Sequence, residues 1–227
     1  MSKGLFVTAT GTDIGKTYVT ALIVKKLREA GYKAGYYKAA LSGAEKTEKG
    51  LIAGDADIVN RIAGLGEDIN NLVSYVYENA VSPHLAAQIE GKPVELSVVK
   101  AAYKKLAAKY DYITMEGSGG IICPIRYDDT SHIFLEDIIK ELKLCTILVA
   151  DAGLGTINST VLSVEYMRNR NITVKGIILN HFHEGSILEL DNRKMVEELT
   201  GIPVIAFVKD NDIDINMSTE VLAALYA

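Results

Sequence analysis

The residues best suited to chemistry lie in the stretch 9–17, Ala-Thr-Gly-Thr-Asp-Ile-Gly-Lys-Thr. This stretch joins an apolar run at residues 5–7 to a helical pattern that begins near Lys16. In a loop of this kind the backbone N–H groups point at phosphate oxygens. The lysine reaches the β- and γ-phosphates, and the hydroxyl of a residue such as Thr17 binds Mg²⁺. The sequence therefore indicates a nucleotide phosphate site.

The loop departs from the motif G-x-x-x-x-G-K-[ST] at its first position, where Thr10 stands and the glycine follows one residue later at Gly11. The interpretation therefore depends on Gly15, Lys16 and Thr17 together with the strand–loop–helix context. The alternative is a glycine-containing turn between a strand and a helix that binds nothing.

Further polar residues follow other apolar runs of the chain. Lys38 ends the second predicted strand, Glu116 follows the run 112–115, and Asn180 follows the run 177–179. Ligands of open α/β sheets bind outside the carboxyl ends of the strands, so we expect these side chains to gather beside the phosphate loop. Lys38 would neutralise a phosphate or carboxylate there, or else be a solvated lysine at a strand end.

Hard oxygen donors suited to Mg²⁺ are available from Thr17, Asp55 and Glu116. The alternative for Asp55 is an N-cap of the helix that follows it. The loop Gly117–Gly120 would offer backbone N–H groups to a polar ligand, or else form a tight turn that satisfies only its own chain. Ser42 would hydrogen-bond substrate or phosphate, or else close its loop.

The amide of Asn180 can hydrogen-bond the edge of a nucleobase. GTPases often carry Asn-Lys-x-Asp at this position, where the aspartate reads guanine, but here Asn180 is followed by His181, Phe182 and His183. Adenine is therefore favoured over guanine. The two histidines have no visible third ligand or orienting partner, which favours surface-loop residues over a metal or catalytic role.

The elements needed to position these groups alternate along the chain. Apolar runs without polar alternation predict strands covered on both faces, and the intervening patterns predict helices. The expected strands include residues 5–7, 36–38, 112–115, 147–150, 176–179 and 203–207, and the expected helices begin near Lys16 and cover 83–90, 95–109, 132–143, 156–170, 187–200 and 216–226. This order predicts a three-layer α/β fold of the P-loop NTPase type, with a mostly parallel sheet between helices, in a single domain over residues 1–227. The segment 39–79 is less regular and is expected to cross the active edge.

Bulk properties exclude several classes of protein. The formal net charge of −5 gives no footprint for nucleic acid or for an anionic membrane, and no apolar run approaches membrane-spanning length. Cys123 and Cys145 are too few for a disulfide framework and fit a reducing compartment. The start Met1-Ser2-Lys3-Gly4 shows no signal-peptide pattern, so we expect a cytoplasmic protein.

Taken together, these blocks resemble dethiobiotin synthetases, the ATP-dependent carboxylases of biotin synthesis. The resemblance spans nearly the whole chain and is carried by residues 12–17, 35–38, 42–43, 55, 82–84, 116–120, 154–158 and 180. It implies that ATP, Mg²⁺, CO₂ or bicarbonate, and 7,8-diaminononanoate yield dethiobiotin, ADP and phosphate. A carbamate on the diamine attacks the γ-phosphate to give a carbamic–phosphoric anhydride, and the second amine then closes the ring. A homodimer is also implied.

The resemblance assigns a role to each matching residue. Catalytic roles fall to Lys38, Lys16 and Thr12. ATP binding falls to Asp13, Ile14, Gly15, Lys16, Thr17, Tyr18 and Asn180, and Mg²⁺ binding to Thr17, Asp55 and Glu116. The substrate site is implied to comprise Lys38, Ser42, Ser82, Gly117, Ser118, Gly119, Gly155 and Asn158, the last two meeting the substrate carboxylate across the dimer interface.

Partition-type ATPases, which use ATP to switch dimerisation, share this fold and form the main alternative. Those proteins carry an extra lysine early in the loop, where Gly11 stands here, and this chain lacks the basic surface expected of a DNA-binding partner. Amidotransferase-type cobyrinate chemistry would need a glutaminase domain for which 227 residues leave no room. A noncatalytic binding module would have little use for two lysines around a metal site.

Overall fold

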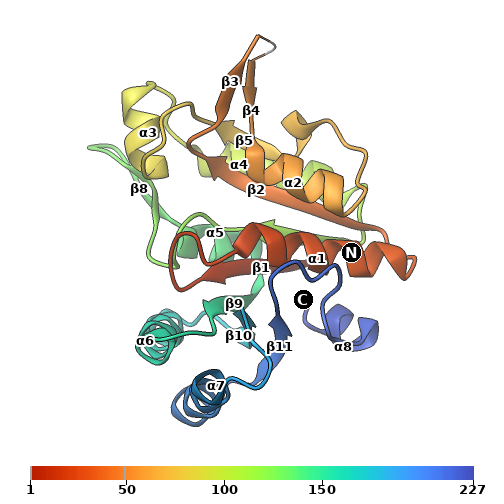
Figure 1. The fold of residues 1–227 in the computed structure, drawn as a ribbon. Coiled ribbons are helices and arrows are strands. Elements are labelled where there is room, and N and C mark those ends of the chain that lie inside the picture. Colours follow the sequence, from red (N-terminus) through yellow and green to blue (C-terminus); the bar gives the residue numbers. More distant parts are fainter. Residues whose placement is uncertain (1, 49) are drawn as a thin grey trace.

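Seven parallel strands form the central sheet of the computed structural model, which describes residues 2–48 and 50–227 (Figure 1). Met1, in the N-terminal segment considered above, and Lys49, in the segment 39–79, lie outside the described residues. The strand order is β11-β10-β9-β1-β6-β2-β5. The bounds are β1 (Lys3–Ala9), β2 (Ala34–Leu41), β5 (Val73–Val76), β6 (Tyr112–Glu116), β9 (Cys145–Asp151), β10 (Val174–Asn180) and β11 (Val204–Val208).

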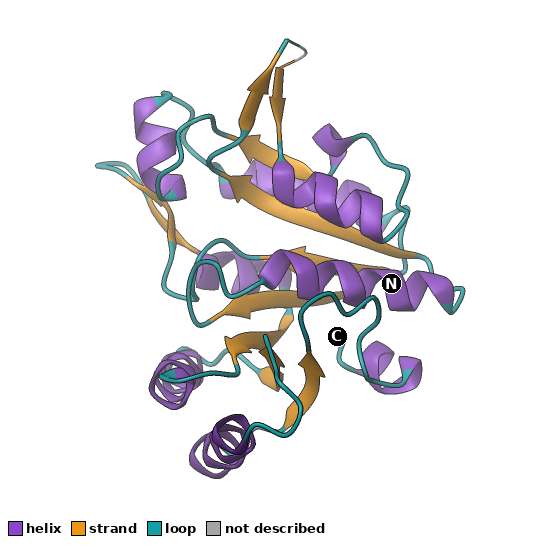
Figure 2. Ribbon diagram, in the orientation of Figure 1, coloured by secondary structure: helices purple, strands orange, loops and turns teal. Residues whose placement is uncertain are grey.

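Helices cover both faces of this sheet, which gives the three layers that the sequence predicts (Figure 2). One buried cluster joins the sheet to α1 (Lys16–Glu29), α2 (Gly54–Ile62) and α8 (Thr219–Ala224). Two further clusters join the opposite face to α3 (Pro83–Ile89), α4 (Leu96–Ala107), α5 (Leu135–Leu142), α6 (Thr156–Asn169) and α7 (Ile187–Thr200). Side chains of a strand point alternately to the two faces of the sheet. Leu5 and Val7 of β1 therefore belong to the first cluster, and Phe6 between them belongs to the second.

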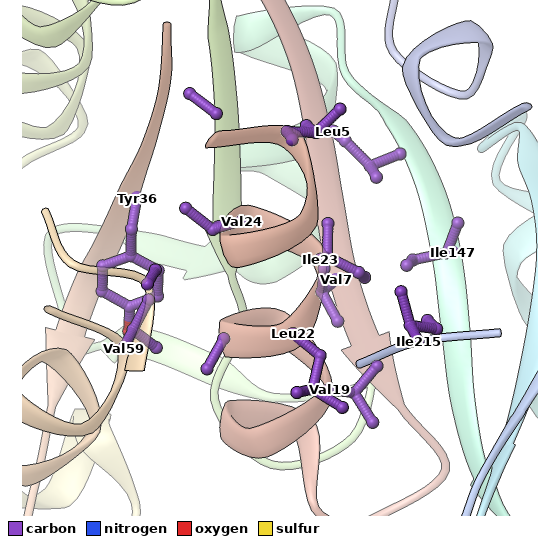
Figure 3. Packing of buried hydrophobic residues seen from close by; sticks show 14 of the residues in the cluster. Leu5, Val7, Val19, Leu22, Ile23, Val24, Tyr36, Val59, Ile147 and Ile215 are labelled. Carbon is purple, nitrogen blue, oxygen red and sulfur yellow. The ribbon is translucent and has the colours of Figure 1, made fainter. Parts of the chain in front are cut away.

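The helix that follows the phosphate loop is the most deeply packed element on its face. Val19, Leu22 and Ile23 of α1 are buried in one cluster with Leu5, Val7 and Ile147 of the sheet (Figure 3). Full burial of one such side chain contributes about 1.5–3 kcal/mol, so this packing fixes α1 firmly. The first turn of α1, which carries the loop lysine and threonine, is therefore held on a rigid support.

Most of the expected elements are confirmed within one to three residues, but the segment 39–79 is more ordered than the sequence indicates. It contains the hairpin β3 (Glu45–Thr47) and β4 (Gly50–Ile52), helix α2, a 3₁₀ turn η1 (Ile69–Asn71) and the edge strand β5. Parallel pairing with β5 extends β2 to Leu41. The prediction that Lys38 ends its strand is therefore wrong: the strand continues for three more residues.

The expected helix over 132–143 is also shorter than predicted. Residues His132–Phe134 form β8, which pairs antiparallel with β7 (Pro124–Tyr127), and α5 begins only at Leu135. The backbone N–H of Phe134 donates to the Asp137 carboxylate at 2.8 Å, which marks the start of the helix. In the part of the chain that the structure describes, no helix has the length and apolar composition needed to cross a membrane.

The backbone of β2 at Gly35 lies close to the ring of Tyr110, a residue just before β6. A Cβ atom at Gly35 would lie 2.5 Å from the buried ring of Tyr110. We therefore expect Gly35→Ala to lower the free energy of unfolding by about 1–3 kcal/mol, the usual effect of overpacking. Urea unfolding monitored by circular dichroism measures this change.

The matched control for this substitution is Gly54→Ala. Gly54 begins α2 and has open space where a Cβ would lie, so alanine should leave stability unchanged or raise it slightly. Equal losses in the two variants would contradict the role assigned to the contact between Gly35 and Tyr110.

Candidate active site

The loop between β1 and α1 has the backbone geometry of an anion site. Gly15 caps α1 in the left-handed region at φ 83°, and Asp13 also has a positive φ of 59°. Across residues 2–48 and 50–227, no described group accepts a hydrogen bond from the backbone N–H groups of residues 11–15. Unpaired N–H groups at a helix N-terminus bind phosphate oxygens, so the loop is ready for this ligand.

A cavity of about 440 Å³ opens in front of this loop. Its lining comprises Thr12, Asp13, Gly15, Lys16, Thr17, Lys38, Leu41, Ser42, Asp55, Glu116, Ser118 and Gly119. Eleven of these twelve were expected from the sequence to belong to the site, Leu41 being the exception. Parallel strands and α2 therefore bring together residues that are more than 100 positions apart in the chain.

Lys16 is buried at the base of the loop. Its Nζ donates to the carbonyl oxygen of Gly11 at 3.1 Å, so the side chain already folds back over the phosphate-binding turn. Burial is the main cause that lowers the pKa of Lys16, and the nearby ammonium of Lys38 lowers it further. Glu116 and Asp55 raise the pKa of Lys16 by less than this, and a phosphate anion at the loop would raise it further because it adds negative charge beside the ammonium.

Lys38 lies between two carboxylates. Its Nζ is 2.6 Å from Asp55 Oδ2, 2.8 Å from Glu116 Oε1 and 3.1 Å from the carbonyl oxygen of Gly117. Burial by itself would lower the pKa of Lys38, but Glu116 and Asp55 together outweigh it and the pKa is raised. Because the folded pKa exceeds the unfolded one, the stabilisation is present at neutral pH and is lost only as the pH rises through the folded value. Lys38 therefore acts as a fixed cation.

The Glu116 carboxylate accepts three hydrogen bonds from side chains of the site. Its Oε1 accepts from Thr17 Oγ1 at 2.8 Å as well as from Lys38, and its Oε2 accepts from the Tyr36 hydroxyl at 2.9 Å. Burial raises the pKa of Tyr36 well above its usual range, and the Glu116 carboxylate raises it further, so the phenol stays a donor. Tyr36 was not assigned a role from the sequence. Its position two residues before Lys38 on one strand, and hence on the same face, is the signal that identifies it.

The donor set beside the loop fits a hard divalent cation. Thr17 and Glu116 are already in contact, and Asp55 reaches the same ammonium as Glu116, so three oxygen-bearing side chains converge on one corner of the cavity. Mg²⁺ usually takes one or two carboxylates together with phosphate oxygens and water, not a cage of protein ligands. Among the described residues no group of three or more His, Cys, Asp or Glu side chains is placed to hold a metal ion.

One alternative left open by the sequence is excluded. Asp55 is not an N-cap, because α2 begins at Gly54 with Ala53 in the cap position, and the Asp55 carboxylate instead binds Lys38. The loop after Glu116 makes two contacts with β2: Gly117 accepts from Lys38, and Ser118 Oγ donates to the carbonyl oxygen of Ala40 at 2.9 Å. Both contacts connect β6 to β2.

Of the residues assigned by resemblance to the substrate site, Gly117 contacts Lys38 but does not line this cavity, and three others do not line it either. Ser82 is exposed and precedes α3, while Gly155 and Asn158 line a separate hollow of about 460 Å³ on the surface of α6 and α7. That hollow is lined mainly by apolar side chains, among them the exposed Leu154 and Leu162. A role for these three residues therefore needs a contribution from outside the cavity.

A second hollow of about 420 Å³ adjoins the phosphate loop through the shared Gly15. It is lined by Gly15, Tyr18, Asn180, His181, Lys209, Asp210 and Asn211. The Asn180 amide nitrogen donates to the carbonyl oxygen of Ile14 at 3.0 Å and would overlap a Cβ atom at Gly15. The expected ATP-binding residues Tyr18, Asn180 and Ile14 are thus brought together at this hollow. Asp151 contacts the His181 ring and orients it, a partner that the sequence did not reveal.

This fold and this loop define a P-loop nucleoside triphosphatase. A solved ParA family ATPase from Chlorobium tepidum superposes with a TM-score of 0.58 at 13% identity, covering 99% of this chain and 90% of the other. The MinC:MinD cell division complex from Aquifex aeolicus gives a TM-score of 0.57 at 15% identity, over 92% and 82% of the respective chains. At these identities the likeness concerns the fold alone. A family model described as an AAA domain matches residues 3–216.

Sequence relatives identify the family within this class. An ATP-dependent dethiobiotin synthetase of Brachyspira hyodysenteriae is 54% identical over 210 residues, which cover 92% of this chain and 93% of the relative. One from Clostridium perfringens is 51% identical over 226 residues, covering 98% and 99%. The chain belongs to the ATP-dependent dethiobiotin synthetase family. The resemblance inferred from the sequence motifs is confirmed.

Removing the ammonium from the pair of carboxylates should destabilise the fold. Glu116 is 1% exposed in its side chain, so Lys38→Met leaves a buried carboxylate without its cation. We expect the free energy of unfolding to fall by about 3–5 kcal/mol, the usual effect of breaking a buried ion pair from one side. Denaturant unfolding at neutral pH measures the loss.

Two further variants distinguish this effect from a general loss of packing. Adding Glu116→Gln to Lys38→Met removes the unpaired charge and should recover a large part of the stability. Lys46→Met removes the exposed pair with Glu78 and should change stability by less than about 1 kcal/mol. A double variant as unstable as Lys38→Met alone would show that charge is not the cause.

Proposed function

We propose that the protein catalyses the ATP-dependent closure of the ureido ring of dethiobiotin from 7,8-diaminononanoate and CO₂, with release of ADP and phosphate. Family membership supports this reaction. The structural observation that carries it is the second buried cation: Lys38 faces the same cavity as Lys16 and the phosphate loop. A site that only hydrolyses a triphosphate needs no second ammonium beyond the γ-phosphate. A carbamate anion that attacks this phosphate does need a cation to hold it.

The reaction proceeds in three steps on the substrates themselves. An amine of the diamine adds to CO₂ and releases a proton, giving a carbamate. A carbamate oxygen then attacks the γ-phosphorus and ADP leaves, giving a carbamic–phosphoric anhydride. The second amine then attacks the carbonyl carbon, and the bond between this carbon and the phosphate oxygen breaks. Phosphate leaves, and a second proton is released. No protein nucleophile is required, so the protein contributes positioning and charge stabilisation.

The residues of the cavity take roles that follow from their charge. Lys16 binds the β- and γ-phosphates, and Lys38, whose pKa is raised, stays protonated and holds the carbamate oxygens in line with the γ-phosphorus. Thr12 contributes its hydroxyl at the front of the loop. Mg²⁺, which we assign to Thr17, Asp55 and Glu116, neutralises charge on the phosphate oxygens when it is bound.

The remaining assignments concern the diamine and the nucleotide base. Ser42, together with Gly117, Ser118 and Gly119, would flank the diamine beside Lys38, since Ser42, Ser118 and Gly119 line the cavity. Asp13, Ile14, Gly15, Thr17 and Tyr18 would hold ATP along the loop, with the base beside Asn180.

The two free cysteines among the described residues support a reducing compartment such as the cytoplasm. We also propose that residues 1–227 act as one domain.

A homodimer would explain the residues that the cavity leaves out. Leu154, Leu162 and Leu199 are 90%, 62% and 52% exposed around the hollow that also contains Gly155 and Asn158. Exposed apolar patches of this kind mark association surfaces. A second copy covering it would bring Gly155, Asn158 and the N-terminus of α6 to the carboxylate tail of the partner subunit's substrate.

A dimerisation switch of the partition-ATPase type is the competing function. Solved structures that share this fold include a ParA family ATPase and MinD cell division proteins, but their identity of 13–16% supports shared architecture only. Gly11 stands where that class carries its additional lysine. The dethiobiotin synthetase relatives, at 51–54% identity, support the synthetase reaction instead.

A product assay tests the proposed reaction. The protein is incubated with MgATP, bicarbonate and 7,8-diaminononanoate, and dethiobiotin is sought by mass spectrometry. Lys16→Ala and Lys38→Ala should each reduce turnover by about 10²–10³-fold, since a preorganised charge donor contributes about 3–4 kcal/mol to transition-state stabilisation. The exposed Lys33, beside the start of β2, gives the control Lys33→Ala, which should turn over normally. ATP hydrolysis without dethiobiotin would favour the switch function.

The proposed dimer surface is tested separately by Leu162→Glu. A charge in the centre of the apolar patch should convert a dimer into a monomer in analytical ultracentrifugation, because the carboxylate would be buried without a partner. Val98→Glu, at a 45% exposed position on α4 outside the patch, should leave the assembly unchanged. A dimer that persists in Leu162→Glu would place the interface elsewhere.

A further inference from the structure

His181 occupies an uncommon position beside the phosphate loop. It follows the last residue of β10 with a left-handed backbone at φ 55°, a region in which histidine is more frequent than most residues. Its ring lines the hollow of about 420 Å³ that adjoins the main cavity at Gly15. If the loop binds a triphosphate, as the proposed function requires, this hollow is the place for the base.

The amide of Asn180 in this hollow is held in one orientation. Its Nδ2 lies 3.0 Å from the carbonyl oxygen of Ile14 and 3.1 Å from Nε2 of His181. A carbonyl oxygen can only accept, so the NH₂ group must face Ile14, and its second hydrogen is directed at the imidazole. Both N–H bonds of the amide are thereby used inside the protein.

Asp151 determines which nitrogen of His181 carries the proton. Oδ2 of Asp151 lies 2.7 Å from Nδ1 of His181, and a carboxylate accepts, so Nδ1 donates to Asp151 and Nε2 accepts from the Asn180 amide nitrogen, which can only donate. The other carboxylate oxygen, Oδ1, accepts from the backbone N–H of Gly153 at 2.7 Å. Strand pairing places Asp151 directly beside Asn180, so the three side chains are in register.

The free atom of this arrangement is Oδ1 of Asn180. Among the described residues no group donates to this oxygen; Asn180 is only 3% exposed, but the oxygen is not one of the fully buried atoms that lack a partner, so a small part of its surface is accessible from the hollow that Asn180 lines. An open amide oxygen accepts hydrogen bonds and cannot donate them. A base with an amine at this place donates a hydrogen bond to the Asn180 oxygen. A base with a carbonyl there places a second acceptor against it, and no hydrogen bond forms.

We propose that Asp151 and His181 are positioning residues that lock the Asn180 amide with its oxygen toward the ligand, and that they thereby select nucleotides with an exocyclic amine on the base. This inference rests on the proposed function for the presence of a nucleotide, but it concerns base selection and not ring closure. His181 and Asp151 are 38% and 42% exposed in their side chains, so water competes for the contact. The lock therefore changes affinity modestly.

Direct binding of ADP and inosine diphosphate to the full chain tests this selection. The two ligands differ in the group at the sixth position of the purine, an amine in ADP and a carbonyl in inosine diphosphate. Isothermal titration should show wild-type protein binding ADP about tenfold more tightly, the scale of one satisfied against one unsatisfied hydrogen bond. In His181→Leu and Asp151→Asn the ratio should fall to about two, because the contact with Ile14 is then the only one that holds the amide in this orientation.

Three controls separate base selection from general damage to the site. Tripolyphosphate, which has no base, should bind wild type and variants equally. His181→Gln, whose amide oxygen can accept the same bond from Asn180, should restore a large part of the discrimination. His183→Leu removes the neighbouring histidine, which pairs with Glu189 outside the hollow, and should leave the ratio unchanged.

An unchanged ratio in His181→Leu and Asp151→Asn would overturn the inference, as would a loss of tripolyphosphate binding equal to the loss of ADP binding. The titrations contain neither diamine nor bicarbonate. Absence of dethiobiotin in the product assay would therefore refute the proposed reaction while leaving base selection intact, and an unchanged ratio in an active enzyme would do the reverse.

Discussion

The contact of one buried ammonium with two carboxylates is the interaction on which the site depends. Lys38 comes from the middle of β2, Glu116 from the end of β6 and Asp55 from the first turn of α2, so three elements are held together at one atom. Opposite charges this close in a buried setting determine one another's ionisation and position. The cavity in front of the phosphate loop keeps its shape because this cluster cannot rearrange without leaving a charge unpaired.

The same cluster explains why the site suits anion chemistry. A lysine that stays protonated is a poor base but an effective partner for negative charge that develops in a reaction. Lys16, at the other side of the cavity, is in the opposite condition, since burial and Lys38 lower its pKa more than Glu116 and Asp55 raise it, and the protein balances its charge only in part. The protein thus balances the charge of Lys38, and a bound substrate completes the balance for Lys16. This arrangement favours binding of a phosphate at the loop and of a second anion beside it.

The sequence predicted the sheet, the phosphate loop and most of the cavity, because these depend on local apolar runs and on the rule that strands present their carboxyl ends together. It was wrong where distant pairing decides the outcome. The strand containing Lys38 continues to Leu41 because β5, more than thirty residues later, pairs with it. Asp55 resembled a cap because local propensity does not reveal Lys38. The partner of His181 was missed because the register between β9 and β10 creates it.

The extension of β2 beyond Lys38 has a consequence for how the site can vary. The backbone N–H of Lys38 donates to Leu72 across the sheet, so the lysine is anchored in regular structure on both sides, while the chain becomes irregular only after Leu41. Segments outside regular sheets tolerate insertions and substitutions far better than their strands do. The short hairpin of β3 and β4, which lies in this irregular part of the chain, can therefore vary in length and composition while the ammonium of Lys38 keeps its place.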